Sequence, residues 1–74
     1  MGLKIEELAK IDFRTQYKQG DTVRLAKDCK TPNNKFKKNE EFIVEDLKET
    51  TLYLINEKGG LTIHRFLSEL IQKL

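Results

Sequence analysis

The chain has 74 residues, a formal net charge of +2, and 35% charged and 38% hydrophobic residues. This length predicts a single domain over residues 1–74, and the composition suits a globular protein rather than a disordered one. No stretch approaches the roughly 20 apolar residues that span a bilayer, and the charged N-terminus is unlike a signal peptide. Cys29 is the only cysteine, which argues against a disulfide-stapled secreted domain. We therefore expect a soluble, cytoplasmic protein.

The first predicted element is a short helix over residues 2–12. Ile5, Leu8 and Ile11 recur at a spacing of three, and the acidic residues near its start suit the helix dipole. A helix of this length is marginal alone, so we expect it to pack on the rest of the fold.

A strand and a long loop come next. Val23 and Leu25 alternate with polar or small residues after a turn at Gly20-Asp21, which is the pattern of a half-buried strand. The loop "DCKTPNNKFKKN" follows, with Pro-Asn-Asn chemistry that favours a tight turn. Phe36 is the large apolar residue in this polar loop, and we expect it to fold back and cover the open end of a barrel.

A β-hairpin is the clearest element of the sequence. The runs "EFIVEDL" and "TLYLIN" are rich in strand-forming residues and are joined by a short polar link. Their alternation directs Phe42, Val44, Leu52 and Leu54 to one face, and Tyr53 and Ile55 to the opposite face. The turn "NEKGG" and a short strand "LTI" follow.

The C-terminal segment "HRFLSELIQKL" predicts a helix that begins at Thr62 or just after it. Its apolar residues form a helical stripe at Phe66, Leu67, Leu70, Ile71 and Leu74. The predicted core then consists of Val23, Leu25, Phe42, Val44, Leu52, Leu54, Ile63, Phe66, Leu67 and Leu70.

This order of elements predicts a domain of the α+β class that is mainly β. We expect a small antiparallel barrel of four or five short strands with short N- and C-terminal helices. "QGDTVRLAKD", a long loop, "KNEEFIVEDL" and "TLYLINEKGG" resemble a Src-homology-3-like barrel over about residues 17–66. The chain has no tryptophan, and the aromatic ligand-binding residues of signalling Src-homology-3 domains are not recognisable. The resemblance therefore implies a fold and does not imply recognition of proline-rich peptides.

Catalytic and metal-binding constellations are scarce. Cys29 is the only thiol and His64 the only imidazole, and nothing in the sequence brings them together as a nucleophile and base. A zinc site would need carboxylates from scattered positions, and adjacent acidic residues on a strand face opposite sides. We expect a non-catalytic protein without a cofactor or a metal.

Protein binding is the favoured function. Tyr53 and Ile55 form an apolar face that either seats the N-terminal helix or stays open as an interaction site, and acidic Glu45 and Glu57 near them could steer a basic partner. We expect a small binding module that acts on a protein partner and is a monomer or a weak homodimer. The Lys-, Asn- and Ile-rich composition suits a bacterial or phage accessory or inhibitor protein.

Nucleic-acid binding is the alternative function. Residues 27–38 carry five lysines and one acid, which gives this segment a net charge of +4 that could neutralise phosphates. The candidate residues are Lys27, Lys30, Lys35, Lys37, Lys38 and Arg24, with Tyr17 or Phe36 as stacking faces. The pI of about 8.7 and the seven carboxylates that follow residue 38 weigh against it.

Overall fold

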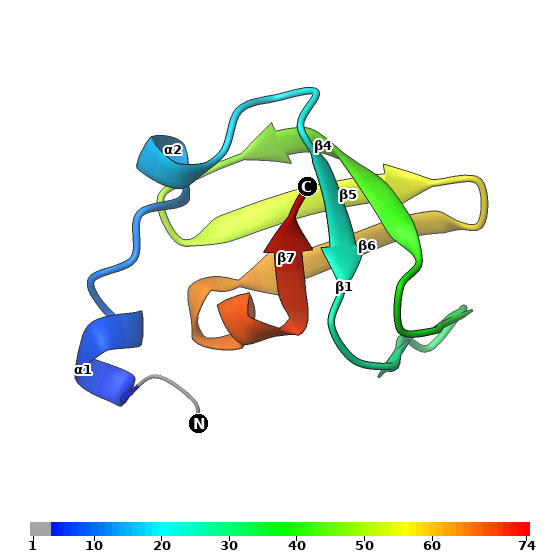
Figure 1. Cartoon of the computed structure of the whole chain (residues 1–74), viewed down its shortest axis with the longest axis horizontal. Coiled ribbons are helices and arrows are strands. Elements are labelled where there is room, and N and C mark those ends of the chain that lie inside the picture. The colour runs from blue at the N-terminus through cyan, green and yellow to red at the C-terminus, as the bar shows by residue number, and fades with distance from the viewer. Residues whose placement is uncertain (1–3) are drawn as a thin grey trace.

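The computed structural model describes residues 4–74 and shows a small, mainly β fold (Figure 1). The short helices are α1 (Ile5–Leu8), α2 (Phe13–Gln16) and the 3-10 helix η1 (Arg65–Leu70). The strands are β1 (Thr22–Leu25), β2 (Cys29–Lys30), β3 (Lys35–Phe36), β4 (Glu41–Leu47), β5 (Thr51–Asn56), β6 (Gly59–His64) and β7 (Ile71–Lys73).

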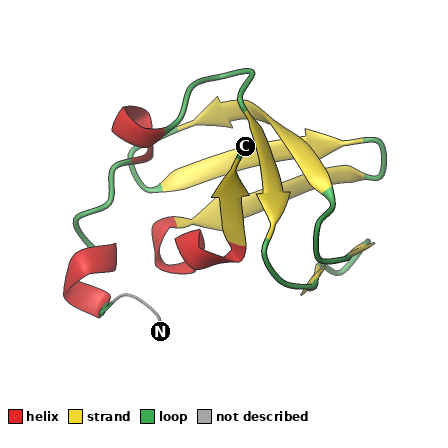
Figure 2. Cartoon of the chain, viewed as in Figure 1, coloured by secondary structure: helices red, strands yellow, loops and turns green. Residues whose placement is uncertain are grey.

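Five of these strands form one antiparallel sheet in the order β6-β5-β4-β1-β7, and β2 and β3 form a separate two-stranded hairpin (Figure 2). The larger sheet curls into a half-barrel whose concave side holds the core. This confirms the expected α+β, mainly β class and is compatible with a small barrel. No helix in residues 4–74 is long and apolar enough to cross a membrane.

Strand alternation places the core where the sequence predicted it. Val23 and Leu25 of β1 are fully buried, and the inward residues of β4, β5 and β6 are buried. These inward residues are Phe42, Val44, Leu52, Leu54, Leu61 and Ile63. The sequence predicted all of them except Leu61. Successive side chains of a strand point to opposite faces, so on a sheet with one covered face the alternation of apolar residues shows which side chains face inward.

Phe36 and Phe13 complete the core. Phe36 is 1% exposed and packs edge-to-face on Phe42 with ring centroids 5.0 Å apart, which confirms that this loop residue folds back onto the barrel. Phe13 is also fully buried and lies in α2, which the sequence did not predict.

The N-terminal helix predicted over residues 2–12 is wrong in extent. Within residues 4–12 the structure has the four-residue helix α1, which ends at Leu8, and the four-residue helix α2 begins only at Phe13. Residues 2 and 3 of the expected helix lie outside the described residues. Asp12 adopts an extended backbone, and its side chain accepts a hydrogen bond from Arg14 N at 2.9 Å. This N-cap begins α2 and keeps it separate from α1, since an N-cap residue has non-helical dihedrals.

The predicted C-terminal helix is wrong at its start, because residues 62–64 belong to β6, and again beyond Leu70. The segment forms the 3-10 helix η1 and then strand β7, in which Ile71 pairs with Leu25 of β1. Phe66 and Leu67 are 45% and 49% exposed, so their assignment to the core is wrong, and Leu70 is only partly buried. The physical reason is that β1 needs a second hydrogen-bonded neighbour, and pairing with β7 supplies one while burying Ile71.

Candidate functional site

The outer face of the sheet carries a row of side chains that the core does not use. Thr22 of β1 pairs with Ile43 of β4, and Ile43 pairs with Ile55 of β5. Directly opposed residues in antiparallel strands have Cβ atoms about 4.5–5.5 Å apart, so the two isoleucines are neighbours. Ile43 is 44% exposed and Ile55 is 39% exposed, although β4 and β5 each have a hydrogen-bonded neighbour on both sides.

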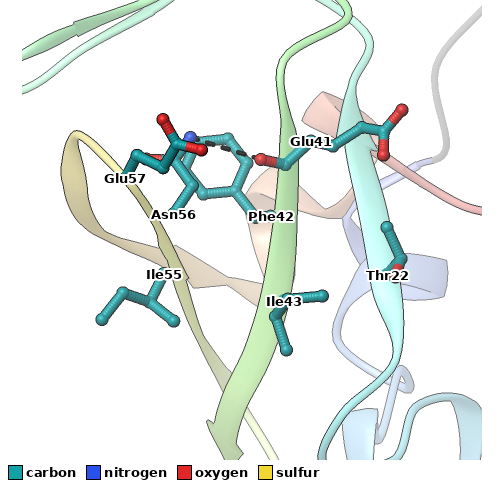
Figure 3. A pocket seen from close by; sticks show the side chains of 7 residues that line it. All are labelled: Thr22, Glu41, Phe42, Ile43, Ile55, Asn56 and Glu57. Atoms are coloured by element: carbon teal, nitrogen blue, oxygen red, sulfur yellow. Dashed lines mark hydrogen bonds between the residues drawn. The ribbon is translucent and has the colours of Figure 1, made fainter.

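A hollow of about 280 Å³ opens along this row, and we call it the outer groove (Figure 3). Its lining residues are Thr22, Glu41, Phe42, Ile43, Ile55, Asn56 and Glu57. On the far side of Ile55, the paired residue of β6 is Gly60. Because Gly60 has no side chain, β6 leaves that flank of Ile55 uncovered.

Carboxylates stand at one end of the outer groove. Glu41 and Glu57 are exposed, and neither forms an ion pair within the described residues. Asn56 Nδ2 donates a hydrogen bond to the carbonyl oxygen of Glu41 at 3.2 Å, which ties the ends of β5 and β4 together (Figure 3). This end therefore combines a hydrogen-bonded backbone with two exposed carboxylates that form no ion pair within the described residues.

A second hollow of about 250 Å³ continues from that end and is lined by Glu40, Glu41, Asn56, Glu57 and Lys58. Lys58 Nζ lies 2.9 Å from Glu40 Oε2, and Lys37 N donates to the same oxygen at 2.6 Å. These contacts, that of Lys58 first, lower the pKa of Glu40 below its usual value. The charge of Glu40 is thus balanced by Lys58, whereas Glu41 and Glu57 form no ion pair within the described residues and could contact a basic ligand.

The opposite end of the groove runs into a β-bulge. The register of β4 against β5 shifts between Val44 and Asp46, so Asp46 pairs with Tyr53. Tyr53 is half-buried, and Lys48 Nζ lies 5.9 Å from its ring centroid. The bulge residue Glu45 is exposed, and its carbonyl oxygen accepts a hydrogen bond from Gln19 Nε2 at 3.0 Å.

The structure brings part of the predicted protein-binding set together. Ile55 and Glu57 line the same hollow, whereas Tyr53 and Glu45 lie at the bulged end outside it. Sequence reasoning missed Ile43, Glu41 and Thr22. The signal for Ile43 was present, because the alternation that directs Phe42 and Val44 inward also directs Ile43 outward.

Helix α1 does not cover Ile55. It packs near η1, and Figure 1 shows it at the opposite end of the sheet from the β5–β6 turn that follows Ile55. The alternative in which this face seats the N-terminal helix therefore does not apply to the groove, whose apolar floor stays open in the described part of the chain.

The lysines of the alternative site lie on and beside the β2–β3 hairpin. Lys30 and Lys35 are paired across it, and Lys27, Lys37 and Lys38 flank it. Arg24 is separate, because it lies on β1 between Glu41 of β4 and Gln72 of β7.

Neither predicted stacking face is free. Phe36 is buried in the core, so its suggested role in stacking on a base is wrong. Tyr17 is half-buried between Phe13, at a centroid distance of 5.7 Å, and Lys73 Nζ, which lies 5.8 Å from the ring centroid.

Cys29 and His64 each make contacts that do not involve the other residue. Cys29 is a free, half-buried thiol that pairs with Phe36 and packs against the core. His64 Nδ1 accepts a hydrogen bond from Phe66 N at 3.3 Å and caps η1. Residues 4–74 contain no group of three or more His, Cys, Asp or Glu side chains arranged to hold a metal ion.

Known proteins offer no guide to the outer groove: no protein-family model, curated protein or solved structure matches the chain.

Proposed function

We propose that the protein is a non-catalytic binding module that takes a segment of a protein partner in the outer groove. The observation that carries this proposal is the pair Ile43 and Ile55, two adjacent isoleucines that are 44% and 39% exposed on central strands. Exposed apolar patches rimmed by polar groups mark interaction sites. A contact that covers both side chains would remove this apolar surface from water.

The charges around the groove favour a basic partner. Glu41 and Glu57 stand at one end, and Glu45 and Asp46 stand on the bulge at the other. A segment with one large apolar side chain between lysines or arginines would fill the hollow and meet acidic groups on both sides. Such complementarity accelerates encounter and sets orientation more than it raises affinity.

The fold suits this role. A Gly20-Asp21 turn that opens β1, a long connection from β1 to β4 and a meander through β4, β5 and β6 support a Src-homology-3-like barrel. A rigid antiparallel sheet would present the groove with little rearrangement on binding. The free thiol of Cys29 is consistent with a cytoplasmic location.

A peptide-display selection against the folded protein tests the proposal. We expect enriched peptides to carry an apolar residue flanked by basic residues, and their binding to shift the NMR signals of Thr22, Ile43 and Ile55. Ile55→Ser should weaken binding by at least tenfold, because it removes half of the apolar floor.

Leu67→Ser is the matched control, since Leu67 is an exposed apolar residue outside the groove. It should leave the affinity unchanged. The proposal fails if no peptide is enriched, or if the enriched peptides bind the Ile55→Ser variant as tightly as the original protein.

A further inference from the structure

The β2–β3 hairpin and its flanks concentrate positive charge, with five lysines and one acidic residue in residues 27–38. Five lysines there are exposed and belong to no ion pair within residues 4–74: Lys27, Lys30, Lys35, Lys37 and Lys38. The nearby carboxylates fold the segment instead. Asp28 Oδ1 accepts a hydrogen bond from Lys38 N at 2.8 Å, and Glu40 is paired with Lys58.

The hairpin register places two of these lysines on one face. Lys30 lies directly opposite Lys35, and Cys29 lies opposite Phe36. Because Phe36 points into the core, its strand neighbour Lys35 points away from it. Lys30 and Lys35 therefore share the outer face of the hairpin, and Lys37 follows directly after the end of β3.

This register is unfavourable by itself. Like charges directly opposite one another destabilise an antiparallel pair, and this pair has only two residues in each strand. An anion bound between Lys30 and Lys35 would convert the repulsion into attraction.

The hairpin is also held in place before any ligand binds. Phe36 packs on Phe42, and Lys58 Nζ donates a hydrogen bond to the carbonyl oxygen of Lys35 at 3.2 Å. Thr31 Oγ1 accepts a hydrogen bond from Asn34 N at 3.0 Å and closes the turn. Anchored backbone reduces the ordering cost of binding.

We propose that the outer face of the β2–β3 hairpin binds the phosphate backbone of duplex nucleic acid without reading its base sequence. Lys35 and Lys37 are two residues apart, a span of at most about 7 Å along the chain, so they can reach successive charges of a polyanion. The hairpin exposes no aromatic ring, since Phe36 is buried, and so lacks the stacking face that single-strand binders use. It likewise exposes no large apolar side chain that would anchor it in a bilayer.

Fluorescence anisotropy with a labelled 20-base-pair duplex, measured between about 20 and 200 mM salt, tests this proposal. Contacts to roughly three to five phosphates predict that log K falls with log salt at a slope of about −3 to −4.5. The variant K30A/K35A/K37A should lose at least tenfold in affinity at low salt and should show a slope smaller in magnitude by about 2 to 3.

The control K10A/K18A/K48A removes the same charge from exposed lysines outside the hairpin and should lose less than threefold. Ile55→Ser should bind the duplex unchanged, which separates this surface from the outer groove. Equal losses in the two triple variants, absence of binding at 20 mM salt, or binding to vesicles containing phosphatidylserine without binding to the duplex would each overturn the proposal. Circular dichroism of each variant verifies that it remains folded.

Discussion

Phe36 is the residue that joins the lysine hairpin to the body of the protein. It is 1% exposed, packs on Phe42, and lies under Lys58 Nζ, which is 5.8 Å from its ring centroid. Phe36→Ala removes this contact and leaves a cavity, so we expect a loss of about 3–5 kcal/mol in the free energy of unfolding. Urea denaturation measures it.

Phe66→Ala is the control for that prediction, because Phe66 is 45% exposed. We expect it to change the free energy of unfolding by no more than about 0.5 kcal/mol. Similar losses for the two variants would mean that Phe36 does not reach the core.

Gly59 provides a second comparison of single residues. Its φ is +140°, and a Cβ atom there would lie 3.0 Å from Asn34 Nδ2 of the hairpin turn. Gly59→Ala should therefore cost about 1–3 kcal/mol, the range for a backbone held in a region that other residues avoid. Gly60→Ala is the neighbouring control: its Cβ would meet only Leu54 O at 3.5 Å, so the melting temperature should stay within a few degrees. Equal melting temperatures for the two variants would contradict this account.

At the scale of elements, β7 is a strand that the sequence did not reveal. Ile71 is 6% exposed and pairs with Leu25, whereas Leu74 is 54% exposed. We expect Ile71→Ala to cost about 2–5 kcal/mol and Leu74→Ala to cost less than about 1 kcal/mol. Chemical denaturation compares them, and strand-type chemical shifts at residues 71–73 verify the element. A helical pattern of shifts there would contradict the fold.

The difference between predicted and unpredicted elements has a physical origin. Strands β1, β4 and β5 carry a local signal, because an alternation such as that of Phe42 and Val44 specifies both the strand and its buried face. The local pattern of Phe66, Leu67, Leu70 and Ile71 indicates a helix as clearly as the alternation of β4 indicates a strand. The end of this segment forms a strand instead, because it pairs with β1, which is far away in the chain, and tertiary context overrides local propensity.

The candidate site was predictable to a similar degree. Ile55 could be assigned to an exposed face from the pattern of β5 alone, and Glu57 could be placed near it because it lies in the turn that follows. Their juxtaposition with Thr22 and Glu41 depends on the registers between β1, β4 and β5, which no local pattern contains. The facing lysines Lys30 and Lys35 were equally hidden, because the segment was expected to be an irregular loop.

At the scale of the whole molecule, three ion-paired carboxylates make the fold sensitive to acid, and two of them, Asp21 and Glu40, connect distant segments. A hydrogen bond from the Lys18 backbone and then the Lys73 ammonium lower the pKa of Asp21. The Lys58 ammonium lowers the pKa of Glu40, and the Arg14 guanidinium lowers that of Asp12. Through these pairs α2 gains its cap, β7 is tied to the start of β1, and the β5–β6 turn is tied to the start of β4.

Each of these pKa values is lower in the folded state than in the unfolded chain, so the unfolded chain takes up protons first as the pH falls. The stabilisation is therefore complete above about pH 5 and is lost progressively below about pH 4.5, as the folded carboxylates become protonated. The groups are exposed, so salt should weaken the effect. We expect the urea midpoint of the original protein to decrease as the pH is lowered from 5 to 2.5. The variant D21N/E40Q should have a lower midpoint at pH 7 and should lose less of it over the same pH range. A parallel fall in both proteins, or an Asp21 pKa measured by NMR at or above the ordinary value of 3.8, would show that these ion pairs do not set the acid stability of the fold.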